Sequence, residues 1–197
     1  MSDLSRLNDA VEPLVERARA GDETGFEELV RQCHQQIYRW ALVHTGDADD
    51  AEDVAQEVLV RLHAGLRRYQ ARSRFTTWLF QITRNTAAEF HRRRKSRERA
   101  LERHRALELA DAESRDQSEA PPGGRLARLV RAFLTDLPLR QREVFDLVDL
   151  QDHAPIEVSR MLGMNPVTVR AHLFRARRAI REQILKRHPD VVEECRQ

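Results

Sequence analysis

Apolar residues recur at three- and four-residue spacing along most of this chain, the pattern of amphipathic helices, and no segment alternates with the period of two that marks a strand. In the first half this spacing predicts helices over 13–20, 23–45 and 48–68, and a fourth from 75 into the mid nineties. Gly21, Asp22, Gly46 and Asp47 stand between them as stop and cap residues. Residues 1–11 are polar and are expected to fray. Four helices with short connections predict one compact bundle.

The apolar period is lost over residues 107–124, where Asp, Glu, Ser, Pro and Gly accumulate. Such a composition is typical of a flexible acidic linker. Beyond it the helical pattern resumes. The sequence therefore predicts an all-α fold of two small helical domains, 12–106 and 125–188, joined by the linker 107–124.

The clearest motif lies in the second predicted domain. A short helix, 155–162, is followed by Gly163 and by a longer helix that Asn165 can cap, with Pro166 in its first turn. This pattern predicts a helix-turn-helix. An inward stripe of the second helix comprises Val169, Leu173, Ala176 and Ile180, and most of its arginines fall outside that stripe: Arg170, Arg175, Arg177, Arg178 and Arg181.

Arginines on the outer face of such a helix can reach phosphates and base edges in a DNA major groove. The alternative is a solvated surface helix, in which cations near the carboxyl end only answer the helix dipole. Arg170 lies in the first half of the helix, where the dipole disfavours a cation. Its position therefore favours a DNA partner.

Charge changes the picture because it is segregated, although the net charge of the 197 residues is only +2. Residues 45–60 hold six acids and no Lys or Arg, whereas residues 84–105 hold nine bases and three acids. One surface is thus suited to a basic protein and another to a polyanion. For Asp49, Asp50 and Glu52, stabilisation of a helix amino end is an equally good explanation.

A second candidate nucleic-acid site is the loop 69–74 with the helix after it, where rings alternate with cations. Phe75 and Trp78 stand at helical spacing, which favours a core position for Trp78. Tyr69 and the polar loop residues are better placed to hold an extruded base. The candidate residues are Tyr69, Arg72, Ser73, Arg74, Arg84, Asn85, His91 and Arg92.

Several classes of site and location are not indicated. Cys33 and Cys195 form no CxxC pair, so we expect free thiols and no metal. The chain has no phosphate-binding G-x-x-x-x-G-K-[ST] loop and no nucleophile constellation, so we expect neither a cofactor nor enzymatic activity. Its apolar runs are too short to span a bilayer and no signal peptide opens it, so we expect a cytoplasmic protein.

Four segments then occur in one order: GDETGFEELVRQCHQQIYRWALVHTGDADDAEDVAQEVLVRL, RYQARSRFTTWLFQITRNTAAEFHRRR, LPLRQREVFDLV and the helix-turn-helix. With them the chain resembles the extracytoplasmic-function (ECF) sigma factors of bacterial RNA polymerase. The resemblance covers both predicted domains. It implies a transcription initiation factor that binds core polymerase, recognises and melts promoters, and catalyses no reaction itself.

The resemblance also implies roles for individual residues. The family's D-x-x-Q-E signature, on the helix that docks against the β′ clamp helices, matches Asp53, Gln56 and Glu57. The loop matching 69–74 captures a flipped base of the minus-ten element, and the helix after it lies along the opening strand; for Asn85 a structural amide contact fits equally well. The β flap is an implied contact of the second domain. The minus-thirty-five element would be read by Asn165, Val167, Thr168, Arg170, Ala171, His172 and Arg175.

The sequence departs from the family in ways that affect these expectations. Asp152 and Ala154 replace a usual Gly and Ser before the helix-turn-helix, which removes a helix cap typically worth about 1 kcal/mol. Ala171 and His172 replace a short hydroxyl and an Arg, so base preference cannot be transferred. An anti-sigma factor is a possible partner. Two alternatives remain: a helix-turn-helix regulator that binds duplex DNA without polymerase, and an interaction protein that reads no DNA.

Overall fold

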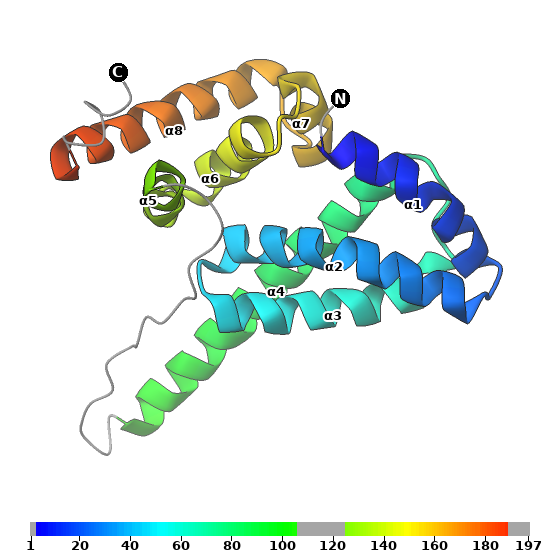
Figure 1. Ribbon diagram of the computed structural model, residues 1–197. Coiled ribbons are helices and arrows are strands. Elements are labelled where there is room, and N and C mark those ends of the chain that lie inside the picture. Colours follow the sequence, from blue (N-terminus) through cyan, green and yellow to red (C-terminus); the bar gives the residue numbers. More distant parts are fainter. Residues whose placement is uncertain (1–2, 106–124, 189–197) are drawn as a thin grey trace.

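The computed structural model describes residues 3–105 and 125–188, and every regular element in these two ranges is helical, which confirms the all-α prediction. The predicted linker and Cys195 lie outside these ranges. The helices form an N-terminal unit and a C-terminal unit (Figure 1). The N-terminal unit contains α1 (Asp3–Arg19), α2 (Glu23–Thr45), α3 (Ala48–Leu66) and α4 (Phe75–Arg105). The C-terminal unit contains α5 (Arg125–Leu134), α6 (Leu139–Phe145), the π-helix η1 (Asp146–Leu150), α7 (Pro155–Leu162) and α8 (Pro166–Arg187).

The predicted cap residues set the ends of α2 and α3. The Asp22 carboxylate accepts a hydrogen bond from Gly25 N at 3.0 Å, and the Asp47 carboxylate accepts one from Asp50 N at 2.9 Å. Gly46 ends α2 with φ +75°, a conformation that costs glycine little. The predicted apolar stripe of α3 is buried against α2 and α4, and comprises Val54, Val58, Leu62 and Leu66.

The expectation that residues 1–11 fray is wrong for the described part of that segment. Helix α1 begins at Asp3 and continues through Pro13, and Leu4 and Val11 are buried. Asn8 is also buried, and its side-chain oxygen accepts hydrogen bonds from the backbone and the hydroxyl of Thr76, both at 3.3 Å. The few apolar residues here do follow helical spacing. Packing against α2 and α4 supplies the stabilisation that their number alone did not indicate.

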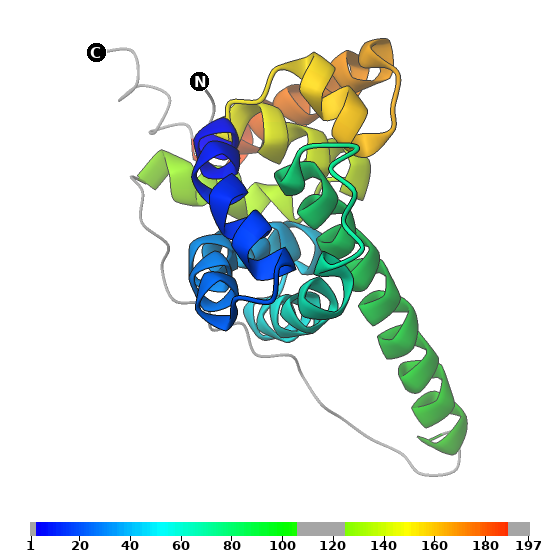
Figure 2. The ribbon, with the colours of Figure 1, turned by 90° about the vertical axis from the view of Figure 1, so that its right-hand side faces the viewer.

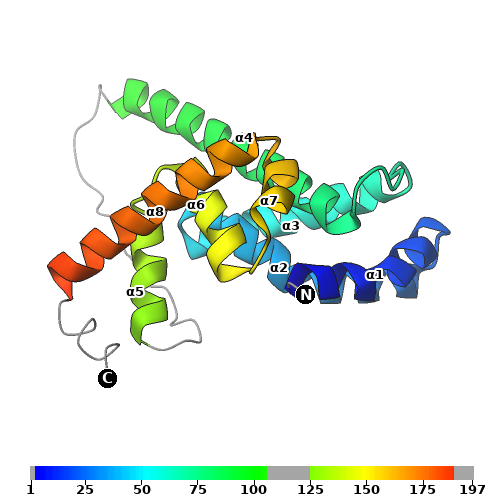
Figure 3. The ribbon, with the colours of Figure 1, turned by 90° about the horizontal axis from the view of Figure 1, so that it is seen from above.

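The helix-turn-helix forms as predicted. Gly163, with φ +62°, ends α7, and the Asn165 side chain accepts from Val167 N at 2.9 Å at the start of α8. The predicted inward stripe of α8 is buried, and α8 runs across α5 and α6, against which it packs (Figure 3). Ala154 has no capping side chain, but the Glu157 carboxylate accepts from Ala154 N at 3.3 Å. One half of a capping box therefore remains at α7.

Between α6 and α7 the chain winds into η1, a single wide turn. Gln151 N donates to Asp146 O at 3.0 Å, the five-residue spacing of a π-helix. The turn brings the Leu150 carbonyl and the Gln151 side chain toward α2. Arg39 donates to Leu150 O at 3.0 Å, and Gln36 donates to the Gln151 side-chain oxygen at 3.0 Å.

The two units are in direct contact through α2 and α4 on one side and α6, η1 and α7 on the other. Many of these contacts are polar. Arg142 of α6 donates to Val43 O at 3.0 Å, and Gln81 of α4 donates to Met161 O. The arginine-rich end of α4 extends away from the remaining helices (Figure 2).

Two buried titratable side chains of α2 are kept uncharged. Burial raises the pKa of the Cys33 thiol to about 12, so it remains protonated and unreactive. Burial, with the positive charges of Arg84 and Arg142, lowers the pKa of His44 to about 3. Glu143 lies 3.7 Å away, but two arginines already pair with its charge, so the ring is neutral at pH 7.

The neutral state of His44 makes stability depend on pH. An unfolded chain binds a proton at this ring below about pH 6.5, whereas the folded chain does so only near pH 3. The free energy of unfolding therefore falls as pH is lowered from 6.5, by up to about 1.4 kcal/mol per pH unit. Urea denaturation between pH 7 and 5 measures it. His44→Gln should flatten the curve, and a parallel curve would contradict the assignment. The charged or titratable groups facing the ring are Arg84, Arg142, His91, Arg140 and Glu143.

No helix in the two described ranges is long and apolar enough to cross a membrane.

Candidate nucleic-acid and protein-binding surfaces

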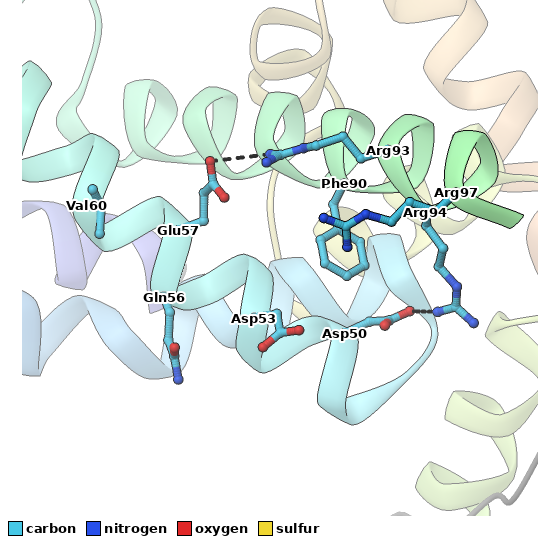
Figure 4. A pocket seen from close by; sticks show the side chains of 9 residues that line it. All are labelled: Asp50, Asp53, Gln56, Glu57, Val60, Phe90, Arg93, Arg94 and Arg97. Carbon is cyan, nitrogen blue, oxygen red and sulfur yellow. Dashed lines mark hydrogen bonds and ion pairs between the residues drawn. The ribbon is translucent and has the colours of Figure 1, made fainter. Parts of the chain in front are cut away.

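The residues predicted to bind polymerase line an open groove of about 560 Å³ between α3 and α4 (Figure 4). Asp53 and Gln56 are exposed there, and no hydrogen bond or ion pair links either to another described side chain. Gln56 points away from α4. The lining residues are Asp50, Asp53, Gln56, Glu57, Val60, Phe90, Arg93, Arg94 and Arg97.

Glu57 differs from its two predicted companions because it is already engaged. It accepts from Arg61 at 2.7 Å and from Arg93 at 3.3 Å, and these hydrogen bonds, the one from Arg61 above all, lower its pKa. Arg61 also donates to Glu89 at 2.5 Å, which ties α3 to α4. Glu57 therefore shapes the groove, whereas Asp53 and Gln56 are available to a partner.

Sequence reasoning missed Val60, which is 70% exposed at the edge of the same groove. It lies four residues after Gln56 and outside the buried stripe of α3, so helical spacing was a usable signal. An exposed apolar side chain beside free polar groups is suited to packing against a partner helix.

The structure places Tyr69 differently from the prediction that its ring meets a base. Tyr69 is 6% exposed, and its hydroxyl donates to Ser73 O at 2.5 Å. Its ring centroid lies 4.9 Å from that of Trp78 and 5.7 Å from that of Phe75, so the Tyr69 ring packs against these two rings and not against solvent. The side chains presented to solvent are those of Arg72, Ser73 and Arg74. Base contact by Tyr69 stays a prediction that requires this loop to open.

Along α4 the predicted DNA contacts divide between two faces. Asn85 and Arg92, seven residues apart, are exposed. Arg84 and His91, also seven apart, face the rest of the fold: Arg84 Nε lies 3.0 Å from the Glu143 carboxylate, and His91 Nε2 is in hydrogen-bond contact with His44 O at 3.1 Å. Of these four side chains, Arg84 alone is half-buried in this arrangement of the units, and His91 stays exposed although its ring contacts α2.

On α8 the predicted contacts gather on one outer face. Val167 is 68% exposed, and Thr168, Arg170 and Arg175 are exposed as well. No acidic side chain of the described ranges forms an ion pair with Arg170 or Arg175. Ala171 and His172 are half-buried.

Two further arginines of α8 are engaged inside the C-terminal unit. Arg177 binds Asp149 through two hydrogen bonds of 2.6 and 2.9 Å, and Arg178 donates to Glu182 at 2.7 Å. Sequence reasoning missed Phe174, which is 68% exposed between Arg170 and Arg175. It lies outside the buried stripe, so the helical period again contained the signal. An exposed ring there is suited to contact with a thymine methyl group.

Asn165 caps the start of α8, so the effect of its substitution on stability must be measured separately from any effect on DNA binding. We expect Asn165→Ala to lower the free energy of unfolding by about 1 kcal/mol, because Val167 N loses its hydrogen-bond acceptor. Asn165→Ser supplies another side-chain oxygen and should remain within a few tenths of a kcal/mol of wild type. Urea denaturation of the three proteins measures both. Equal losses in the two variants would show that the cap is not the cause.

No group of three or more His, Cys, Asp or Glu side chains with metal-binding geometry occurs in the described ranges.

Comparisons with known proteins agree with the order of these surfaces along the chain. A family profile for Sigma-70 region 2 matches residues 29–97, and one for Sigma-70 region 4 matches residues 127–180. The RNA polymerase sigma-H factor of Pseudomonas aeruginosa is 32% identical over 181 residues, which cover 85% of this chain and 90% of that protein. The probable RNA polymerase sigma factor RfaY of Xanthomonas campestris is 31% identical over 174 residues, 86% of this chain.

The chain spans 43% of the length of the Xanthomonas relative. Among solved structures, the sigma factor RpoE of Bartonella quintana, in complex with the anti-sigma factor NepR, superimposes with a TM-score of 0.64. That match covers 83% of this chain and 98% of the Bartonella chain at 23% identity. At this identity the match shows a shared fold only.

Proposed function

This chain belongs to the extracytoplasmic-function sigma factors of the sigma-70 family, and on that premise we propose that it binds core RNA polymerase and directs it to promoters. The observation that carries the proposal is the presence of two chemically different free surfaces. Within residues 3–105 and 125–188, the α3–α4 groove presents an acid and an amide without a partner, whereas α8 presents arginines without an acidic partner. The first suits a basic protein and the second suits DNA.

The groove is the proposed contact for the clamp helices of the polymerase β′ subunit. Asp53 and Gln56 supply a carboxylate and an amide for arginine side chains on a partner helix, and Val60 supplies apolar contact. Glu57 holds the groove in shape through Arg61 and Arg93. A β-flap contact of the C-terminal unit belongs to the same proposal.

Promoter melting is assigned to the loop 69–74 and to α4. Exposed Arg72 and Arg74 can neutralise phosphates beside an extruded base, and Asn85 and Arg92 continue along one face of α4. Tyr69 supports the loop from beneath through its hydrogen bond to Ser73 O. Strand opening then depends on binding energy, a few kcal/mol per extruded base, and uses no catalytic chemistry of this chain.

The outer face of α8 is assigned to the duplex of the minus-thirty-five element. Val167, Arg170 and Phe174 follow one another at three- and four-residue spacing, as one groove-facing row. Arg175 lies beside this row and suits a phosphate. His172 is half-buried and Ala171 is small, so both shape the row more than they extend it.

Two broader features complete the proposal. A factor that works with polymerase and the chromosome acts in the cytoplasm. The Bartonella relative is held by an anti-sigma factor, and a protein inhibitor that covers the groove or α8 is a natural partner for this chain as well.

In vitro transcription over a library of random promoters tests the function. Purified chain is added to bacterial core polymerase, and transcript starts are mapped. We expect discrete starts that need both components and share an upstream sequence. If no starts appear while the chain alone shifts duplex DNA, the chain is a helix-turn-helix regulator instead.

A further inference from the structure

A buried carboxylate joins the two units. Glu143 of α6 is 1% exposed and lies against α2 and α4 of the N-terminal unit. Its Oε1 is 3.0 Å from Arg84 Nε, and its Oε2 accepts from Arg140 Nη1 at 3.1 Å. The neutral ring of His44 closes a third side at 3.7 Å. Thus one arginine from each unit neutralises a single buried charge.

A second buried carboxylate lies one helical turn further on. Asp146 is buried and lies 3.6 Å from Arg39 of α2. Gln151 donates to Asp146 and accepts from the indole of Trp40 at 3.3 Å. The C-terminal unit therefore presents two carboxylates to cationic side chains of the N-terminal unit.

The partner of Glu143 is a residue with a second proposed use. Arg84 is one of the side chains that the sequence predicts to contact the promoter strand, and a guanidinium binds a carboxylate and a phosphate with the same donors. The loop that precedes α4 also contacts the C-terminal unit, because Arg74 Nη1 lies 3.8 Å from the Glu157 carboxylate of α7. Arg84 cannot pair with Glu143 and with a DNA phosphate at the same time.

We propose that Glu143 substitutes for a DNA phosphate within the chain: it holds Arg84 in a closed arrangement of the two units, and this contact competes with promoter DNA. The inference rests on the proposed function of α4. A buried ion pair adds little net stability, because desolvation offsets most of the attraction, but loss of one partner leaves a costly unpaired charge. The Glu143–Arg84 pair therefore favours one closed arrangement without stabilising it strongly. DNA phosphates can replace Glu143 as the partner of Arg84 when the units open.

The test measures the distance between the units and the DNA affinity of the full chain, without polymerase. Fluorophores are attached at Gln35→Cys and Lys186→Cys after Cys195→Ser; buried Cys33 stays unlabelled. Glu143→Gln removes the charge and keeps the shape. We expect it to add a longer-distance population and to raise affinity for a single-stranded minus-ten oligonucleotide about tenfold, as expected when a binding-competent state becomes more populated.

Three further variants isolate the cause. Glu182→Gln, a matched loss of charge at an exposed site, should change neither the distance nor the affinity. Arg84→Ala should open the units and gain no DNA affinity, because it removes the arginine needed by both partners. If Glu143→Gln does not fold, Arg39→Gln weakens the same interface from α2 and should reproduce the opening and the gain.

Unchanged distance in folded Glu143→Gln and Arg39→Gln would overturn the proposal. Opening without a gain in DNA affinity would overturn the competition with DNA. Neither result depends on transcription starts, which test the sigma-factor function separately.

Discussion

Asp53→Ala/Gln56→Ala is expected to abolish core-dependent transcription while the protein still folds and binds duplex DNA. Both side chains are exposed in the α3–α4 groove without a partner in the described parts of the chain, so their loss leaves no buried group unpaired. Loss of two hydrogen bonds to charged partners costs about 3 kcal/mol, or about a hundredfold in the dissociation constant for core polymerase. Fluorescence anisotropy with labelled chain measures that constant.

The matched control is Asp9→Ala/Gln35→Ala, which removes the same residue types from exposed positions on α1 and α2. It should bind core polymerase as wild type does. Comparable losses in the control and the groove variant, or none in either, would refute the assignment of the groove. Glu57→Ala is a poorer probe because it also breaks the ties to Arg61 and Arg93.

Arg170→Ala/Phe174→Ala is expected to change which promoters are used and to leave binding to core polymerase intact. The two side chains are adjacent on the outer face of α8, and each contact with a base contributes about 1–3 kcal/mol of discrimination. Start-site mapping over the random library should show loss of the upstream preference. Arg175→Ala, at a position suited to a phosphate, should instead weaken promoters uniformly and reduce the salt dependence of binding.

Arg31→Ala controls for the loss of one positive charge. Arg31 is exposed on α2, paired with Glu28, and far from α8 in the chain. An unchanged upstream preference in Arg170→Ala/Phe174→Ala would exclude this face of α8 from promoter recognition. A similar shift caused by Arg31→Ala would mean that net charge, and no specific contact, determines the preference.

Much of this fold could be predicted from the sequence, because apolar spacing and cap residues are properties of a single helix and its immediate neighbours in the chain. The stripe Val54 to Leu66 and the cap at Asn165 were readable in this way. So were the end of α7 at Gly163 and the start of α8 at Pro166. The helical period also places Val60 and Phe174 outside the buried stripes of their helices, and the structure shows that both are exposed.

What the sequence could not indicate depends on contacts between distant segments. Glu143 stands among arginines in a predicted amphipathic helix and reads as an exposed charge, yet His44 and Arg84 enclose it. Tyr69 reads as a loop residue open to solvent, but the rings of Phe75 and Trp78 take it into the core. The burial of Glu143 and of Tyr69 depends on residues from other segments, so the local sequence around each could not predict it.

The number of residues in the π-helix η1 helps to determine how the two units are oriented relative to each other. A π-helical turn holds about one residue more than an α-helical turn, and each residue of an α-helix corresponds to about 100° of rotation. Deleting a single residue between Asp146 and Leu150 would restore the α register and rotate α6 relative to the helix-turn-helix. Glu143 and Asp146 would then leave the face that meets α2 and α4. In this chain, deletion of one residue at this turn is therefore expected to release the two units from each other.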